Sequence, residues 1–393
     1  MATPPSTYLD HAASTPLRPE ALEALVEVSR SSFANPSGSH RAARAARQLI
    51  DEARDRVAEA LGARPGEVVF TSGGTEADNL AVLGAHARRP GLVVASAVEH
   101  PAVAEPVAAL GGATVPVDER GVVDVDALAD RLVALRAAGE EVALVSVMAV
   151  NNEVGTIQHV EAVAAAVHEH AAGALLHTDA VQAAPWVDVA ARGAAYDLIA
   201  VSAHKFGGPK GVGALVVREG VAVAPRLLGG GQERERRSGT PNVAGIVAAA
   251  VALELAVGER KTVADRVGAL RDRLADGLVD AVPGLRETGV PTGPDGRPDR
   301  SHKVAGNCHV CIAGVESESL LFLLEEAGVE ASAASSCASG AMAPSPVLAA
   351  MGVGRDEARG ALRLSLGSTT TDADVDAALA AVPAAVERLR RFA

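Results

Sequence analysis

The strongest constraint on the fold is an alternation of short apolar runs with stretches whose apolar residues recur at helical spacing. The apolar runs are residues 67–70, 92–95, 142–147, 174–177, 198–202 and 213–217. Helical patterns between several of them cover residues 76–87, 126–138 and 160–172. Strands that alternate with helices form mainly parallel sheets with helices on both faces. We therefore predict an α/β fold of this kind, with ligands at the carboxyl ends of the strands.

The chain of 393 residues is long enough for two domains, and its pattern changes after a long apolar stretch. We predict a large domain over residues 15–258 and a smaller α+β domain formed by residues 1–14 and 259–393. Residues 260–282 alternate arginine with acids at helical spacing, which predicts an exposed helix. Residues 287–301 are rich in proline, glycine and charge, which predicts a solvated loop rather than a site.

Charge and hydropathy disfavour several classes of partner. The formal net charge is −13 and no basic tract occurs, so nucleic acid is not an expected partner. The most apolar stretch, residues 243–257, contains Glu254 and falls short of the ~20 residues that span a bilayer, so we expect no membrane partner. Residues 1–5 lack the basic and apolar regions of a signal peptide, and we expect a cytoplasmic protein.

The three cysteines, Cys308, Cys311 and Cys337, are too few and too unevenly spaced for a disulfide framework, so we expect reduced thiols. Cys308 and Cys311 form a C-x-x-C pair that could also bind zinc, with His302 and His309 as further ligands. The apolar run around them predicts a strand, in which residues three apart point to opposite faces. This favours strand packing, and we expect no metal site.

Asp179 and Lys205 form the most informative polar pair in the sequence. Each follows an apolar run, and Lys205 enters a glycine-rich turn at residues 206–213. The chain has only four lysines among its 36 basic residues, so a lysine in this setting suggests that its ability to deprotonate is used. An acid that keeps a pyridine nitrogen protonated and an amine that forms a Schiff base suit pyridoxal 5'-phosphate. An exposed lysine in a strand-to-loop turn is the structural alternative.

Polar groups also follow other apolar runs. Residues 71–76 follow one run and open a helix, which offers amides and hydroxyls to a phosphate. Glu99 and His100 follow a second run, and residues 151–153 follow a third. Because ligands bind at the carboxyl ends of parallel strands, we expect these groups to line one site. Residues 233–237 instead predict a solvated charged loop near a subunit boundary.

Together these segments resemble the cysteine desulfurases, members of the class V aminotransferase superfamily with the fold type I architecture of pyridoxal-phosphate enzymes. The resemblance covers nearly the whole chain. Its motifs are residues 9–16, 35–40, 71–76, 99–100, 151–153, 177–182, 202–213, 230–233, 238–240, 335–339 and 363–367. The departures are modest: Gly74 stands where alanine is common, and Ala333 and Ala334 precede the last cysteine where the family tends to keep a glycine.

The resemblance implies roles around the cofactor. Lys205 would form the Schiff base with pyridoxal 5'-phosphate, and Asp179 would pair with the pyridine nitrogen. Gln182 would hydrogen-bond the phenolic oxygen with Asn152 nearby, and His100 would stack on the ring and take part in catalysis. The residues implied to hold the phosphate are Gly74, Thr75, Ser202, His204 and, from the neighbouring subunit of a homodimer, Thr240.

The resemblance also implies the reaction. Arg363, assisted by Asn35, would hold the carboxylate of L-cysteine, and Cys337 would be the catalytic sulfur acceptor. The Cys337 thiolate would take the substrate's sulfur as a persulfide, leave L-alanine, and pass the sulfur to an acceptor protein. Residues 330–346 are rich in alanine, serine and glycine, as expected of a mobile segment that carries this cysteine.

The acceptor stays open between an iron–sulfur scaffold, tRNA thiolation, DNA phosphorothioation and a thiolated natural product. Two other functions are open from the residues alone. One is an aminotransferase or lyase that never handles sulfur, and Cys337 in its predicted mobile segment argues against it. The other is a scaffold without activity, and intact Lys205, Asp179 and Cys337 argue against that.

Overall fold

The computed structural model describes residues 6–333 and 345–391. Its centre is a seven-stranded sheet with strand order β2-β8-β7-β6-β5-β3-β4. All of its strands run parallel except β8, which is antiparallel to both neighbours. This confirms the mainly parallel sheet predicted from the sequence. The strands are β2 (Val68–Thr71), β3 (Leu92–Ser96), β4 (Ala113–Val115), β5 (Val142–Ser146), β6 (Leu175–Asp179), β7 (Leu198–Ser202) and β8 (Gly213–Val217).

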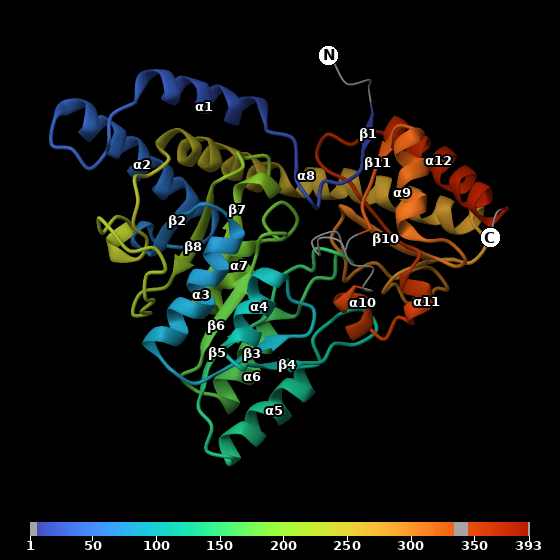
Figure 1. Ribbon diagram of the computed structural model, residues 1–393, viewed down its shortest axis with the longest axis horizontal. Coiled ribbons are helices and arrows are strands. Elements are labelled where there is room, and N and C mark those ends of the chain that lie inside the picture. Colours follow the sequence, from blue (N-terminus) through green and yellow to red (C-terminus); the bar gives the residue numbers. More distant parts are fainter. Residues whose placement is uncertain (1–5, 334–344, 392–393) are drawn as a thin grey trace.

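Helices cover both faces of this sheet, as predicted (Figure 1). The larger hydrophobic core lies under α1, α2, α5, α6 and the first part of α8, whereas α3 and α4 cover the opposite face. The helices are α1 (Pro19–Ser31), α2 (Arg41–Ala60), α3 (Gly74–Arg88), α4 (Pro101–Ala109), α5 (Val125–Ala137), α6 (Val160–His170), α7 (Val189–Arg192) and α8 (Val243–Ala281). Single 3-10 turns are η1 (Pro65–Glu67), η2 (Gly193–Ala195), η3 (Ala203–Lys205) and η4 (Glu233–Glu235).

A second core surrounds a three-stranded antiparallel sheet with order β12-β10-β9. Figure 1 shows this core at the other end of the long axis from α1 and α2. Its elements are β9 (Leu285–Glu287), β10 (Asn307–Ile312), α9 (Ser317–Glu326), β12 (Ala361–Ser365) and α12 (Asp372–Arg390). Nearby lie α10 (Pro346–Ala350), α11 (Arg355–Ala358) and the parallel pair of β1 (Thr7–Tyr8) and β11 (Val329–Glu330).

Helix α8 joins the two cores as one helix of 39 residues (Figure 1). The Asn242 side chain caps it by accepting a hydrogen bond of 3.0 Å from the N–H of Gly245. The first part of α8 packs in the large core, and its later part buries Val267, Leu274 and Leu278 in the second. The helix predicted over residues 260–282 is therefore confirmed as the later part of α8, but its predicted exposure is wrong, because an apolar stripe runs between its charges.

Two segments predicted to be solvated contain buried acids. Glu287 ends β9 and is 6% exposed, although it begins the predicted loop 287–301. Glu233 has a side chain that is 6% exposed, and its carboxylate accepts two hydrogen bonds of 2.8 Å from Arg54 and one of 2.9 Å from the N–H of Phe70. Each buried acid pairs with an arginine: Glu233 with Arg54 of α2, and Glu287 with Arg300 at the far end of the same predicted loop.

Cys308 and Cys311 pack into different hydrophobic clusters on the two faces of β10, which confirms their predicted strand packing. Burial raises the pKa of Cys308 to about 12 and holds the pKa of Cys311 above its ordinary value. No group of three or more His, Cys, Asp or Glu residues is arranged for a metal ion within the described chain. Burial therefore disfavours the thiolate form of both cysteines.

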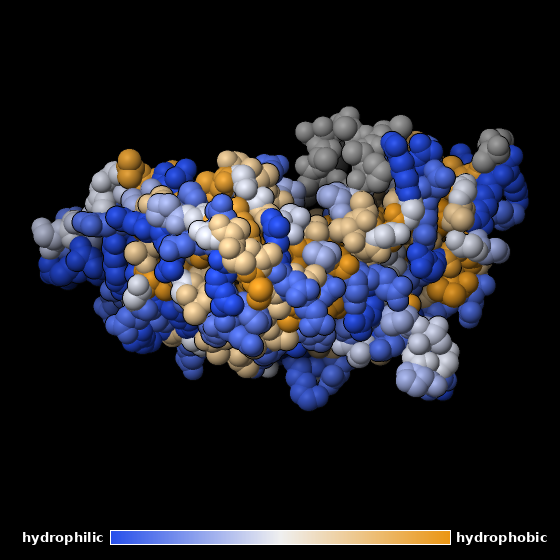
Figure 2. All heavy atoms as spheres, turned by 90° about the horizontal axis from the view of Figure 1, so that it is seen from below, coloured by the Kyte–Doolittle hydropathy of each residue, from blue (hydrophilic) through white to orange (hydrophobic). Residues whose placement is uncertain are grey.

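The surface mixes polar and apolar side chains. Figure 2 shows hydrophilic and hydrophobic residues interspersed over the face that it presents. Within residues 6–333 and 345–391, no helix combines the length and the apolarity needed to cross a bilayer.

Candidate active site

Strands β6 and β7 bring Asp179 and Lys205 to the same edge of the central sheet. Asp179 ends β6 and is 4% exposed, and its Oδ1 accepts a hydrogen bond of 2.8 Å from the N–H of Val181. Lys205 ends η3, directly after β7, and its Nζ donates to the carbonyls of Ala12 at 2.5 Å and Ala13 at 3.0 Å. The predicted pair therefore lies at neighbouring strand ends, with the N-terminal segment over the lysine.

His100 lies close enough to this pair to interact with both charges. It caps α4, because its Nδ1 accepts a hydrogen bond of 3.1 Å from the N–H of Ala102. Burial lowers the pKa of His100, and the charge of Lys205 lowers it further while that of Asp179 raises it. Burial raises the pKa of Asp179, and His100, the Val181 N–H and Lys205 oppose that shift. The three groups thus form one electrostatic unit.

The N-terminal segment, residues 10–15, also binds the predicted Gln182 and His204. Gln182 Nε2 donates to the Ala12 carbonyl at 2.6 Å, so the same oxygen receives both Gln182 and the site lysine. The Thr15 hydroxyl donates to the His204 carbonyl at 2.9 Å. Burial and two nearby lysine charges lower the pKa of His204 to about 4, so its imidazole is neutral at pH 7. These contacts tie the N-terminal segment to Gln182 and to the backbone just before the lysine.

The turn between β2 and α3 forms a cradle for an anion. The first N–H groups of a helix lack intrahelical partners and face the positive end of its dipole. A Cβ on Gly74 would lie 2.8 Å from Cγ2 of Val181, so a side chain there forces its neighbour to move. Ser202 is 2% exposed, and its Oγ would lie 3.9 Å from a Cβ built on Gly73. Thr75 is exposed in the first turn of α3.

Arg363, on β12, connects the second core to the N-terminal segment. It is 4% exposed, its Nη2 lies 2.7 Å from Oδ1 of Asp10, and its Nη1 donates to the Asn152 carbonyl at 2.9 Å. The predicted partner Asn35 is not beside it within one chain. Figure 1 places the α1–α2 connection, which carries Asn35, at the opposite end of the long axis from β10, the neighbour of β12.

For two of the predicted site residues, the described part of the single chain shows no contact with the other site residues. Thr240 is exposed before α8, where it borders a cavity of about 100 Å³ together with Ser72 and Arg237. Cys337 lies outside the described residues, between Ala333 and Ser345.

A cluster of buried acids lies near Asp179, and of its members the sequence indicated Glu99 as a site residue but not Asp78. Asp78, on α3, is 1% exposed and its Oδ1 lies 3.5 Å from Nε2 of the fully buried His177. Glu99 accepts a hydrogen bond of 2.7 Å from the N–H of Met148. Burial raises the pKa of Glu99 to about 8, raises that of Asp78, and lowers that of His177 to about 3. The only signal for Asp78 was its place one helical turn beyond Gly74.

Comparison with known proteins identifies the family of the chain. Residues 7–378 match the aminotransferase class-V family. An IscS-like cysteine desulfurase of Mycobacterium tuberculosis is 44% identical over 398 residues, which cover 98% of both chains. A solved NifS-like protein is 34% identical with a TM-score of 0.86, over 98% of this chain and 100% of its own. The structure of SspA in complex with cysteine is 28% identical with a TM-score of 0.76, over 93% and 99% of the two chains.

The chain therefore belongs to the class-V aminotransferase family, and the fold predicted from the sequence is confirmed. Within that family, its full-length similarity places it among the cysteine desulfurases.

Proposed function

We propose that this cysteine desulfurase converts L-cysteine to L-alanine with pyridoxal 5'-phosphate bound between Asp179 and Lys205, and that it transfers the sulfur to Cys337 as a persulfide. One observation carries the proposal. A buried acid and a lysine meet at the carboxyl ends of neighbouring parallel strands. The structural relative SspA was solved in complex with cysteine, which supports the choice of substrate.

The residues present fit this cofactor. Its aldehyde requires an amine, which Lys205 offers, and its ring nitrogen requires an acid, which Asp179 offers. Its phosphate fits the backbone N–H groups at the start of α3. Gly74 leaves them uncovered, and a side chain at this position would clash with Val181. The residues proposed to hold the phosphate are Gly74, Thr75, Ser202, His204 and, from a second subunit, Thr240. When bound, pyridoxal 5'-phosphate supplies an electron sink that stabilises negative charge at the substrate's α-carbon.

The surrounding side chains prepare the acid and the base for these roles. Burial raises the pKa of Asp179, whereas the N–H of Val181 and the positive charge of Lys205 favour its ionised form, in which it would keep a pyridine nitrogen protonated. We propose that Lys205 Nζ removes the proton from the α-carbon, a step for which it must leave the Ala12 carbonyl. His100 is proposed to cover the ring, and Gln182 and Asn152 to lie at the phenolic oxygen.

Arg363 is proposed to bind the substrate's carboxylate. A guanidinium binds a carboxylate in a bidentate geometry through parallel N–H groups. The structure offers a buried arginine whose Nη2 already binds the carboxylate of Asp10. The substrate therefore exchanges with Asp10, which keeps the guanidinium paired and avoids a buried unpaired charge. Asn35 would assist from the second subunit, because its own chain holds it far from Arg363.

Sulfur transfer requires a thiolate that reaches the substrate. The Cys337 thiolate would form an S–S bond with the substrate's sulfur while the C–S bond of the substrate breaks. The electron pair of that bond goes to the carbon fragment, which takes up a proton and becomes L-alanine. Cys308 and Cys311 are unsuited to this step, because both are buried and burial raises the pKa of each thiol. This argument supports Cys337 as the acceptor.

We further propose a homodimer in the cytoplasm that passes its sulfur to an acceptor protein. Phe33 is 89% exposed and Leu228 is 83% exposed. Phe33 lies on the connection that carries Asn35, and Leu228 lies on the one that leads to Thr240. A second subunit that covers both apolar side chains would also bring these two polar residues to its own site. The division into residues 15–258 and residues 1–14 with 259–393 is proposed on the two separate hydrophobic cores.

The proposal is tested by product analysis with matched lysine variants. With reductant present, the parent should release alanine and sulfide from L-cysteine in equal amounts. Lys205→Ala should lose this activity by at least about 10⁴-fold, as loss of a covalent catalytic group does. Lys210→Ala, five residues away in the glycine-rich turn, should behave as the parent. Formation of pyruvate and ammonia in place of alanine would identify a lyase, and activity in Lys205→Ala would refute the assignment of the lysine.

A further inference from the structure

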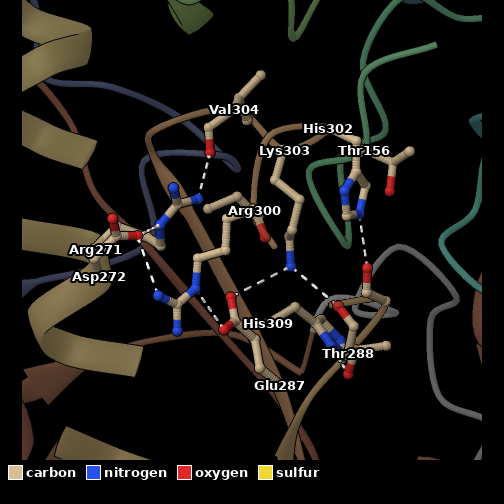
Figure 3. Close-up of polar contacts among 12 residues, drawn as sticks. Thr156, Arg271, Asp272, Glu287, Thr288, Arg300, His302, Lys303, Val304 and His309 are labelled. Atoms are coloured by element: carbon tan, nitrogen blue, oxygen red, sulfur yellow. Dashed lines mark hydrogen bonds and ion pairs between the residues drawn. The ribbon is translucent and has the colours of Figure 1, made fainter. Parts of the chain in front are cut away.

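A buried polar network lies on the three-stranded sheet that carries Arg363 (Figure 3). Lys303 has a fully buried side chain, donates to the Thr288 carbonyl at 3.1 Å, and lies 3.7 Å from Oε1 of Glu287. The other carboxylate oxygen of Glu287 accepts a hydrogen bond of 2.7 Å from Nε of Arg300. Buried ion pairs cost free energy to desolvate and add little stability by themselves. The proposed reaction uses none of these side chains, so their role is to hold other residues in place.

Thr288 connects this network to β10. Its N–H donates to the His309 carbonyl at 2.9 Å, and its Oγ1 lies 2.9 Å from Nδ1 of His309. The same Oγ1 lies 3.5 Å from Sγ of Cys311. Figure 3 shows Lys303 and His309 approaching Thr288 together. Thr288 therefore holds the His309 imidazole in one orientation, while Lys303 holds the backbone of Thr288.

His309 lies directly opposite Arg363 in the sheet. The two residues are paired in the antiparallel ladder of β10 and β12. Side chains of such a pair share one face, with Cβ atoms about 4.5–5.5 Å apart. His309 is fully buried and Arg363 is 4% exposed. Within the described part of the chain, neither Nε2 of His309 nor Nε of Arg363 has a hydrogen-bond partner.

We propose that His309 is a positioning residue for Arg363: its Nε2 accepts the Nε–H of Arg363 when the substrate's carboxylate displaces Asp10 from the guanidinium. The inference rests on the proposed role of Arg363 and adds to it. Asp10 and the Asn152 carbonyl hold the two Nη groups before substrate arrives. Once Asp10 leaves, an acceptor behind Nε keeps the plane of the guanidinium facing the substrate.

The polar contacts permit the tautomer that this role needs. Arginine is always a donor, so a protonated Nε2 on His309 would set one donor against another. A hydroxyl can donate one hydrogen bond and accept others, so Thr288 Oγ1 can donate to Sγ of Cys311 and accept from Nδ1–H of His309. That arrangement leaves Nε2 with a free lone pair. Burial, with the charges of Lys303 and Arg363, lowers the pKa of His309 to about 3, so the imidazole stays neutral at pH 7.

The chain offers a matched control for a test. His302 is a second imidazole in the same network, is 8% exposed, and contacts the Gly289 carbonyl through Nε2 at 2.7 Å, away from Arg363. We expect His309→Leu to raise the KM for L-cysteine about tenfold, the size expected for a lost hydrogen bond to a charged group, with kcat changed less than twofold. His302→Leu should leave KM as in the parent. His309→Gln, which retains an acceptor, should recover most of the affinity.

A ligand without a carboxylate separates positioning from general loosening of the fold. Binding of cysteamine, followed by the change in cofactor absorption, should be equal in the parent and in His309→Leu. The tautomer can be measured by NMR in cofactor-free protein labelled with ¹⁵N-histidine. The signal that disappears in His309→Gln belongs to His309, and in the parent it should show a protonated Nδ1 and an unprotonated Nε2. A protonated Nε2, or equal KM values for the two leucine variants, would overturn the inference. If Arg363→Ala also leaves the KM for cysteine unchanged, the proposed role of Arg363 itself is refuted, and not only that of His309.

Discussion

Arg363 Nη2 lies 2.7 Å from Oδ1 of Asp10, so the arginine proposed to hold the substrate's carboxylate already has a carboxylate partner from the chain itself. We therefore expect Asp10 to compete with the substrate for Arg363. Asp10→Asn keeps the shape but removes the charge, and it should lower the KM for L-cysteine by up to about tenfold with kcat little changed. Glu330→Gln, an equal loss of charge near the same segment, is the control. A raised KM in Asp10→Asn would show that Asp10 orients Arg363 instead.

Glu99 should make stability depend on pH. Burial raises the pKa of its carboxyl from 4.5 to about 8, so the folded chain keeps a proton that the unfolded chain releases. The folded state is therefore most favoured below pH 4.5 and loses this stability as the pH rises to about 8. The loss for this one group reaches ~1.4 kcal/mol per pH unit.

Glu99→Gln should remove that slope. The amide oxygen can still accept from the N–H of Met148, and it binds no proton in this range. Urea unfolding of the cofactor-free protein at pH 5, 6, 7 and 8 measures the difference between variant and parent. Glu105→Gln, an exposed change on α4, should retain the parent's slope. Identical slopes for Glu99→Gln and the parent would refute a protonated Glu99.

Gly74 should tolerate alanine only if Val181 is smaller. A Cβ at this position would lie 2.8 Å from Cγ2 of Val181, so Gly74→Ala should cost about 1 kcal/mol of stability and weaken cofactor binding. In a Val181→Ala background the same change should cost nothing. Gly66→Ala, where a new Cβ would contact nothing within 4 Å, is the control. The free energy of unfolding of the four variants gives this result directly, and a cost that persists without the valine would exclude the clash.

The central sheet could be predicted from the sequence because most of its strands are buried on both faces and therefore form short, continuous apolar runs. The site pair of Asp179 and Lys205 followed from their places after two of these runs. Helix α8 was misread because its apolar stripe becomes visible only when both cores are placed against it. The charged residues between 260 and 282 outnumber the apolar residues of that stripe, and they favoured the prediction of an exposed helix.

The buried acids could not be predicted, because their partners come from distant segments. Glu233 looks solvated in the sequence, yet Arg54 of α2 and the backbone of β2 bind its carboxylate. Asp78 and His177 meet across the packing of α3 on β6, and no local pattern joins them. Likewise, the pairing of His309 with Arg363 depends on the register of β10 and β12. Register and helix packing decide these contacts.

The central claim is that sulfur passes through Cys337, and mass spectrometry of each cysteine peptide after one turnover with L-cysteine tests it most directly. We expect an additional sulfur atom on Cys337 alone in the parent. Cys337→Ser should bind cofactor and cysteine but form neither persulfide nor sulfide, whereas Cys308→Ser and Cys311→Ser should retain parental turnover because both thiols are buried. A persulfide on Cys308 or Cys311, or full turnover without Cys337, would contradict the mechanism.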